Sequence, residues 1–450
     1  MHSKTPQSRL RSNEPVYVEG SAKGEVWAHF PSGTIVRALR DRTRAYPKLA
    51  GEAPPTRAIY GALTRLLPST AVVLDAGTGA GVGALRLTEH FDEVIAIDRD
   101  PQAIAFAREY SPLATYHVGD LGELPPVPAA EQADAVVVCD VLGHLRRPAA
   151  ALRALRGRVK DGATILVAEP SSHVAQHLRS PARRAYSRKA LTAALVRSGY
   201  EPAAFLCEAG TFLVCTGKAN LSSPAFRALV EAETAAEAGR TEQALDAYER
   251  AARSEDSRVR QEALLGRAEL FFTTGRGDQA ARAFFEASDA EGSDSRAVAG
   301  LARVSLAAGA TADALQLGLR AVELEPTDPS AACIVARVAD QLEHPEALSA
   351  WRIASNLAPD DPGVATELAR CAADSGDYKL GIFAFERLRR YGDSLGAMFH
   401  VTLAWLLFAE GRVADATIEA RMATAIDPRE PALAELWPAL EQANAPLGRG

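Results

Sequence analysis

Residues 71–83, Ala-Val-Val-Leu-Asp-Ala-Gly-Thr-Gly-Ala-Gly-Val-Gly, decide the fold of the N-terminal half of this chain. An apolar run that fits a buried strand leads directly into glycines, and a helical stretch over residues 84–91 follows. Glycines at such a junction let the backbone approach a ligand closely, and the start of the helix offers unpaired N–H groups. The stretch therefore predicts a nucleotide-like cofactor at the end of a parallel strand.

The spacing of the glycines separates the classes of cofactor. A dinucleotide site requires a third small residue at position 82, but that position holds Val82 and the third glycine is Gly81. The glycine-rich stretch does not end in Lys followed by Ser or Thr, as a phosphate-binding loop would. With Asp75 two residues before Gly77, the string instead resembles the first motif of class I S-adenosylmethionine-dependent methyltransferases.

Later segments fit this resemblance in the same order. Asp98 ends a strand-like run over residues 93–98, and the resemblance implies that it accepts the ribose hydroxyls, although dinucleotide binders also carry a carboxylate there. Asp120 follows a third run and by resemblance receives the adenine amino group, while Leu121 contacts the ring. The segment from Asp140 to Pro148 is similar to the ubiquinone/menaquinone-type, small-molecule branch of the family.

The resemblance covers residues 55–219 and implies an α/β Rossmann-like methyltransferase domain. Its sheet is expected to be seven-stranded and mostly parallel, with an antiparallel last strand. S-adenosylmethionine is the implied cofactor, and no metal is expected. The cofactor site is predicted to comprise Asp75, Ala76, Gly77, Thr78, Gly79, Gly81, Asp98, Arg99, Gly119, Asp120, Leu121 and Cys139.

Methyl transfer from a sulfonium is a direct displacement, so the protein mainly has to align the acceptor with the methyl group. A base helps where the acceptor carries a proton, and His144 is the first candidate because imidazole titrates near neutral pH. His173, just beyond the fifth strand, is the second. For both, a structural hydrogen bond is the alternative role. The residues after the fourth strand lack the motifs of enzymes that methylate nucleic-acid bases, so such acceptors are disfavoured.

The C-terminal half contains an internal repeat. Small residues that allow close packing of helices recur at spacings of 36, 34, 33, 34 and 35, at Ala244, Ala280, Ala314, Ala347, Gly381 and Ala416. A large aromatic residue follows four positions later in four copies, but Gly318 and Ala420 stand there in the third and sixth. A glycine marks the turn before the second helix in every copy except the fourth.

This period resembles that of the tetratricopeptide repeat family, with about six copies over residues 222–430 and a capping helix and tail over residues 431–450. The resemblance implies an all-α superhelix with a concave groove that binds a protein or a peptide. The array could instead only solubilise, shield or dimerise the rest of the chain. An excess of acidic residues over residues 222–450 points to a basic partner, although such surfaces also serve solubility alone.

Composition limits the remaining possibilities. The chain has 450 residues, of which 47% are hydrophobic and 24% charged, and no run is long enough to span a membrane. The first residues do not form a secretory signal, so we expect a cytoplasmic protein. Residues 1–54 are expected to form a cap or lead-in. A basic cluster there favours a solvated helix face over nucleic-acid binding: Arg37, Arg40, Arg42, Arg44 and Lys48.

Two functions from different classes remain open. The chain is either an S-adenosylmethionine-dependent methyltransferase acting on a small metabolite or on a protein that the repeats recruit, or an interaction scaffold whose methyltransferase fold senses the cofactor or is inactive. The cofactor residues support binding in both cases. They do not determine whether a methyl group is transferred.

Overall fold

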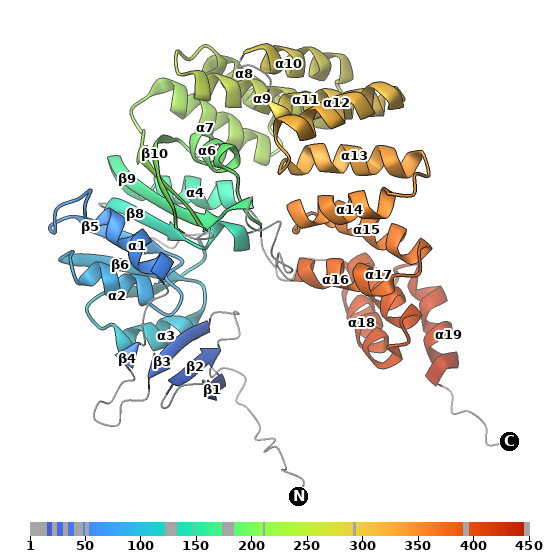
Figure 1. Cartoon of the computed structure of the whole chain (residues 1–450), viewed down its shortest axis with the longest axis horizontal. Coiled ribbons are helices and arrows are strands. Elements are labelled where there is room, and N and C mark those ends of the chain that lie inside the picture. Colours follow the sequence, from blue (N-terminus) through green and yellow to red (C-terminus); the bar gives the residue numbers. More distant parts are fainter. Residues whose placement is uncertain are drawn as a thin grey trace, which may run out of the picture. The chain divides into compact units, whose positions relative to one another are not determined.

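The apolar runs of the N-terminal half form one seven-stranded sheet in the computed structural model (Figure 1). Its strand order is β10-β11-β9-β8-β5-β6-β7, and β11 alone runs antiparallel to its neighbours. This confirms the predicted sheet. The strands are β5 (Val72–Ala76), β6 (Glu93–Asp98), β7 (Thr115–Val118), β8 (Ala133–Cys139), β9 (Val159–Pro170), β10 (Tyr200–Ala209) and β11 (Phe212–Ala219).

The structure describes most of the chain. The described residues are 16–19, 25–29, 35–39, 48–49, 54–121, 133–145, 147–172, 184–209, 212–290, 294–389 and 396–444. Within them, no helix is both long enough and apolar enough to cross a membrane.

The central strands are buried on both faces. In β5, Val73, Leu74 and Ala76 are fully inaccessible to solvent. In β8, all residues of the run 135–138 are inaccessible as well. Buried runs of this kind occur where helices cover both faces of a parallel sheet. The helices of this half are α1 (Pro54–Leu63), α2 (Val82–Thr88), α3 (Pro101–Tyr110), α4 (Pro148–Arg156) and α6 (Arg188–Arg197), with a 3-10 turn, η2, over Leu142–His144.

Strand β5 lies where the order of the sheet reverses. The chain proceeds from β5 to β6 on one side and later returns to place β8 on the other side. In open α/β sheets, ligands bind beyond the carboxyl ends of the strands at such a reversal. The glycine-rich turn that follows β5 is therefore in the position expected of a cofactor site.

The first fifty residues contain a separate small sheet. Strands β1 (Val16–Glu19), β2 (Glu25–His29), β3 (Ile35–Leu39) and β4 (Lys48–Leu49) pair in chain order, all antiparallel. The sequence had predicted a cap or lead-in for these residues. It had also predicted that the basic cluster among them lies on the face of a helix. Arg37 and Lys48 lie in strands, so the prediction of a helix was wrong for these two residues. Arg40, Arg42 and Arg44 lie outside the described residues.

The C-terminal half is a series of helix pairs, as the repeat predicted (Figure 1). Within each pair, a first helix packs antiparallel to a second. The pairs are α7 (Pro224–Glu237) with α8 (Thr241–Ala252), α9 (Ser257–Thr273) with α10 (Gly277–Ala290), α11 (Ser295–Ala307) with α12 (Thr311–Leu324), α13 (Pro329–Gln341) with α14 (Ala347–Leu357), α15 (Pro362–Asp374) with α16 (Tyr378–Leu388), and α17 (Ala397–Ala409) with α18 (Val413–Ile426); α19 (Leu433–Asn444) follows.

Aromatic residues and glycines fit together between successive pairs. Tyr248 of α8 and Phe284 of α10 are buried. A Cβ added at Gly266 would come within 2.4 Å of the Tyr248 ring, and one at Gly300 within 2.2 Å of the Phe284 ring. Each ring therefore occupies space that a glycine of the next pair leaves free. The five turn glycines have φ between 72° and 81°: Gly239, Gly275, Gly309, Gly376 and Gly411.

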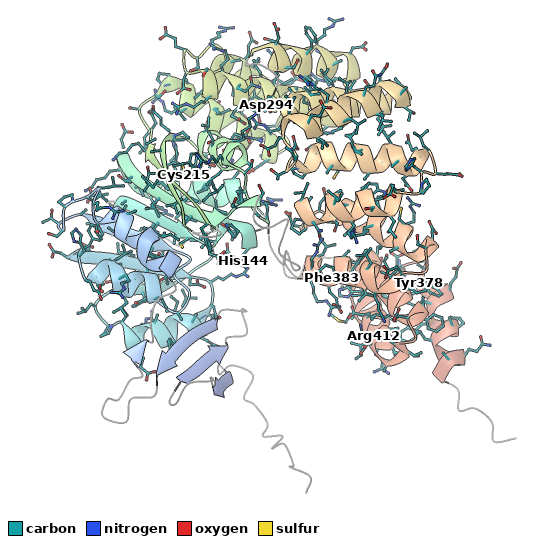
Figure 2. All side chains as sticks on the ribbon, viewed as in Figure 1. His144, Cys215, Asp294, Tyr378, Phe383 and Arg412 are labelled. Atoms are coloured by element: carbon teal, nitrogen blue, oxygen red, sulfur yellow. The ribbon has the colours of Figure 1, made fainter. Side chains whose placement is uncertain are left out.

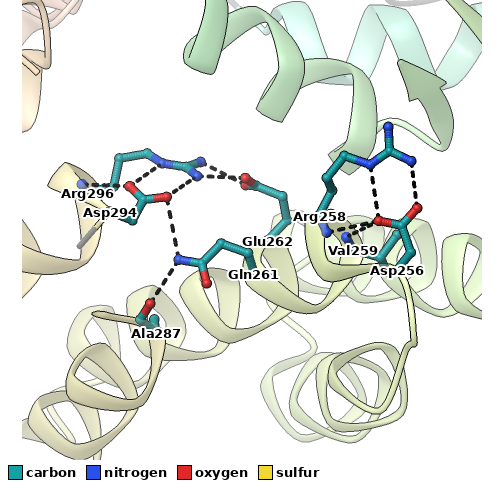
Figure 3. Close-up of polar contacts among 8 residues, drawn as sticks. All are labelled: Asp256, Arg258, Val259, Gln261, Glu262, Ala287, Asp294 and Arg296. Atoms are coloured by element: carbon teal, nitrogen blue, oxygen red, sulfur yellow. Dashed lines mark hydrogen bonds and ion pairs between the residues drawn. The ribbon is translucent and has the colours of Figure 1, made fainter. Parts of the chain in front are cut away.

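Ion pairs connect equivalent positions of neighbouring repeats. Arg296 of α11 binds both carboxylate oxygens of Glu262 in α9, at 2.7 and 2.8 Å, and also its own helix-capping Asp294 (Figure 3). Arg303 pairs with Glu269 at 2.7 Å, and Arg276 with Glu242 at 2.5 Å. In all three pairs the partners are 34 residues apart.

The chain divides into two compact units that do not follow chain order strictly. The second unit contains the repeats from Glu231 onward together with Gly143–Arg146 and Ser172–Ser187. Inside this unit, Ser172 bonds Thr327 at 3.2 Å, and Arg184 forms an ion pair with Asp360. The first unit contains the remaining residues, and with them the whole seven-stranded sheet.

Candidate cofactor site

The turn between β5 and α2 is built from glycines that no other residue could replace without strain. Gly77, Gly79 and Gly81 have φ of 80°, 54° and 81°, in the left-handed region that side chains disfavour. A Cβ at Gly77 would lie 2.3 Å from Val141, and one at Gly81 would lie 2.7 Å from Ala107. The N–H groups of Gly77 and Thr78 donate to the carbonyl of Ile97 at 2.8 and 3.0 Å, which fixes the turn against β6.

Asp75, the last polar residue of β5, is inside the protein. Only 1% of its surface is exposed. Its Oδ2 accepts a hydrogen bond from the Thr78 hydroxyl at 2.7 Å, and its Oδ1 accepts one from the Tyr60 hydroxyl at 3.2 Å. Burial raises the pKa of this carboxyl to about 6. The side chain therefore organises the turn from beneath it.

Asp98 holds the other side of the turn. Its Oδ2 accepts from the N–H of Gly79 at 2.8 Å and its Oδ1 from the N–H of Asp100 at 2.9 Å. Burial raises its pKa, while these two bonds favour the charged form. A carboxylate oxygen accepts more than one hydrogen bond, so both oxygens retain capacity for ligand hydroxyls. Arg99, which follows it, is exposed.

The end of β7 lies next to Asp98. The N–H of Gly119 donates to the carbonyl of Asp98 at 2.9 Å. Asp120 is exposed, and the side chain of Leu121 is 6% exposed. The accessible carboxylate of Asp120 can accept hydrogen bonds from an amino group on a ligand.

A buried carboxylate, Glu169, organises the end of β8. Its Oε1 accepts from the N–H groups of Val141 and Leu142, at 2.9 and 2.7 Å. Before them, Asp140 adopts φ of 60°, which is unusual for a residue other than glycine. Burial raises the pKa of the Cys139 thiol well above its usual range, so this thiol is neutral, and its contact with the cofactor stays a prediction.

The two candidate bases are placed differently from the cofactor residues. His144 is exposed in η2 and belongs to the segment that groups with the second unit (Figure 2). His173 lies outside the described residues. The residues predicted to bind the cofactor therefore all belong to the first unit, and their roles and those of both histidines stay predictions.

Comparison with protein families decides what these two parts are. Residues 74–167 match a family model described as a methyltransferase domain. Residues 229–296, 275–329 and 366–431 match a model of the tetratricopeptide repeat. The chain joins a methyltransferase domain to tetratricopeptide repeats. The cofactor of this domain is S-adenosylmethionine.

The following relatives each match only part of the chain. The magnesium-protoporphyrin O-methyltransferase of Rhodobacter capsulatus is 36% identical over 81 residues, which are 17% of this chain. The chain spans about a third, 34%, of that relative's length.

Two solved structures also match. An N-methyltransferase of Bradyrhizobium japonicum with S-adenosyl-L-homocysteine is 19% identical, with a TM-score of 0.32, over 37% of this chain and 89% of that one. A magnesium protoporphyrin IX methyltransferase of Synechocystis is 14% identical, with a TM-score of 0.31, over 36% of this chain and 83% of that one.

The site of the methyltransferase domain fits the cofactor chemically. The left-handed glycines form a turn without side chains at the end of β5, Asp98 offers oxygen acceptors for ribose hydroxyls, and Asp120 and Leu121 stand at the next strand end. Sequence reasoning missed Tyr60 and Glu169. In the sequence, the only sign of the role of Glu169 was a carboxylate between an apolar run and Pro170. The structure shows that this carboxylate is buried.

Proposed function

We propose that this chain transfers the methyl group of S-adenosylmethionine to an acceptor that the repeat array recruits, either directly or on a carrier. The observation that carries the proposal is the turn after β5, in which three left-handed glycines lie between Asp75 and Asp98. Glycines at the carboxyl end of a parallel strand let the backbone approach a ligand closely, so this turn favours a ligand there. We place the reaction in the cytoplasm.

The chemistry is mainly one of positioning. When bound, the cofactor supplies an electrophilic methyl group on a sulfonium. The protein's part is to orient that group toward the acceptor and to exclude water. Asp98 would hold the ribose, Asp120 and Leu121 the adenine, and the glycine turn the methionine portion. None of these residues has to move a proton.

Proton removal is needed only for acceptors such as hydroxyls or protonated amines. His144 remains our candidate base for those acceptors, with His173 as the second. His144 is exposed, as a group that meets an incoming acceptor must be. If transfer needs a base, His144→Ala lowers turnover without changing cofactor affinity.

The acceptor is a small metabolite or a protein side chain. The name of the Rhodobacter relative makes oxygen the first acceptor atom to examine and magnesium protoporphyrin the first small molecule. Nucleic-acid bases are disfavoured by the sequence that follows β8. Incubation with radiolabelled S-adenosylmethionine, magnesium protoporphyrin and proteins retained by the repeat array would separate these classes.

The decisive test is calorimetric titration of the full chain with S-adenosylmethionine, S-adenosylhomocysteine and NAD. We expect saturable binding of the two sulfur compounds, and loss of that binding in Asp98→Ala. Asp92→Ala, which removes an exposed carboxylate just before β6, is the matched control and should bind normally. Preference for NAD, or no binding, would overturn the enzyme proposal and leave a repeat scaffold. Binding without transfer to any acceptor would favour a cofactor sensor.

A further inference from the structure

Tyr60 connects helix α1 to the cofactor turn, and nothing in the sequence marked it. The side chain is 6% exposed, and its hydroxyl donates to Asp75 Oδ1 at 3.2 Å. Its ring lies against α2 so closely that a Cβ at Gly83 would come within 2.1 Å of the ring and of the hydroxyl oxygen. Gly83 has no unusual φ, so space for Tyr60 explains why this position is glycine.

Asp75 accepts the hydrogen bonds that it makes with the hydroxyls of Tyr60 and Thr78. Tyr60 donates to Oδ1, and Thr78 donates to Oδ2. A protonated carboxyl would have to place a hydrogen of its own among these donors, and would lose an acceptor position. The ionised form is therefore the one that matches the geometry of the turn.

We propose that Tyr60 is a positioning residue for the cofactor: by donating to Asp75 it holds that carboxylate in the accepting form, which fixes Thr78 and the glycine turn in the shape that binds S-adenosylmethionine. The inference rests on the proposed function, because it concerns the affinity of the same turn for its cofactor. Tyr60 acts through Asp75 and the backbone.

The groups facing Asp75 allow this idea to be tested by pH. Burial raises the pKa of Asp75 to about 6, the bonds from Thr78 and Tyr60 lower it, and the charge of Asp98 raises it. The other titratable neighbours are Cys139 on β8 and Tyr116 on β7. Burial raises the pKa of both, that of Tyr116 to about 12, so neither ionises between pH 5 and 7.

The sign of the pH effect follows from these groups. As pH rises through about 6, Asp75 ionises and the turn takes its binding shape, so affinity for S-adenosylmethionine should increase. Removing the Tyr60 hydroxyl withdraws a bond that favours the ionised form. The midpoint of the pH profile should then move upward by about one pH unit.

The experiment is calorimetric titration of the full chain with S-adenosylmethionine from pH 5 to 8, for the wild type, Tyr60→Phe and Tyr200→Phe. Tyr200 is the matched control, because it is fully buried in β10 and its hydroxyl has no hydrogen-bond partner among the described residues. In Tyr60→Phe we expect affinity about five-fold weaker at pH 6, because the binding-competent fraction falls, and nearly unchanged at pH 8. Tyr200→Phe should follow the wild type.

The outcomes separate this inference from the function on which it rests. If the wild type does not bind the cofactor at any pH, the proposed function fails. If the wild type binds and Tyr60→Phe has the same midpoint, or weakens binding equally at every pH, Tyr60 has no such role. Should Tyr60→Phe fail to fold, Thr78→Val removes the other side-chain bond to Asp75 and must raise the midpoint in the same way.

Discussion

At Gly77 two independent constraints exclude a side chain. The backbone has φ of 80°, and a Cβ would lie 2.3 Å from Val141. Gly162 in β9 has nearly the same φ, 76°, but nothing lies within 4 Å of the position its Cβ would take. Substituting Gly162 therefore tests backbone strain alone, whereas substituting Gly77 tests backbone strain together with a steric clash.

For Gly77→Ala we predict a loss of affinity for S-adenosylmethionine of at least about ten-fold, because Val141 or the turn must shift, and such shifts cost about 1–3 kcal/mol. Titration calorimetry measures it. Gly162→Ala should lower the free energy of unfolding by about 1 kcal/mol and leave affinity unchanged. Equal affinities in the two variants would show that the turn after β5 does not approach the cofactor.

Glu343 occupies the turn of the fourth repeat, where the other copies described here have glycine. It adopts φ of 51°, and Gly309 and Gly376 hold the equivalent positions before and after it. For Glu343→Gly we predict a free energy of unfolding higher by about 1 kcal/mol, because a left-handed conformation costs glycine little. Urea unfolding followed by helical circular dichroism tests this. Gly309→Ala, the reverse change, should be destabilising, and a Glu343→Gly variant of lower stability would contradict the argument.

Sequence alone could propose those residues of the candidate site that belong to a continuous motif. Asp75, the glycines and Asp98 were predicted because their spacing is local and its chemistry is specific. Tyr60 was missed because it reaches Asp75 from a helix 15 residues away, and a tyrosine on the buried face of a helix looks like any core residue. Glu169 was missed likewise, since it acts on backbone groups 27 and 28 residues earlier.

At the scale of helices, the third repeat shows how an apparent exception is compensated. Gly318 stands in α12 where α8 and α10 have aromatic residues. A Cβ at Gly318 would lie 2.9 Å from Ile334 of α13, and Ile334 is 3% exposed. The next helix therefore supplies the bulk that α12 lacks. The sequence showed the missing aromatic residue, but the compensation lies 16 residues further on in another element.

A double-mutant cycle tests this exchange. Ile334→Gly should lower the free energy of unfolding by about 3–5 kcal/mol, since it leaves a cavity and adds a helical glycine. Gly318→Phe should also be destabilising, because Ile334 occupies the space. The double variant recreates the arrangement of Phe284 with Gly300, so it should lose less than the sum by more than about 1 kcal/mol. Additive losses in urea unfolding would refute the exchange.

Over the whole repeat array, some of the acidic side chains are held in ion pairs between neighbouring repeats. Glu262, Glu269 and Glu242 are each bound by an arginine of the following repeat. These pairs neutralise carboxylates that the sequence had left available for a basic partner. The charge count alone could not show this, because pairing depends on which repeat faces which.

The buried pair between repeats should carry measurable stability. The Glu262 side chain is 6% exposed, so Arg296→Met would leave it and Asp294 buried without their cation. We predict a loss of about 3–5 kcal/mol in the free energy of unfolding. Arg250→Met breaks an exposed pair with Glu231 and should cost less than about 1 kcal/mol. Similar losses in both variants, measured by urea unfolding, would show that the inter-repeat pair does not stabilise the array.

The exchange of bulk between α12 and α13 has a consequence for engineering and for ancestry. Each helix pair contributes one side of the interface before it and one side of the interface after it. If the second and third pairs exchanged places, Gly318 would face a glycine, and Phe284 would face Ile334. Recombination that cuts within a pair keeps each second helix with the first helix of its successor. The unit to keep intact is therefore the second helix of one pair together with the first helix of the next. Consensus or shuffled versions of the array should be assembled from such units.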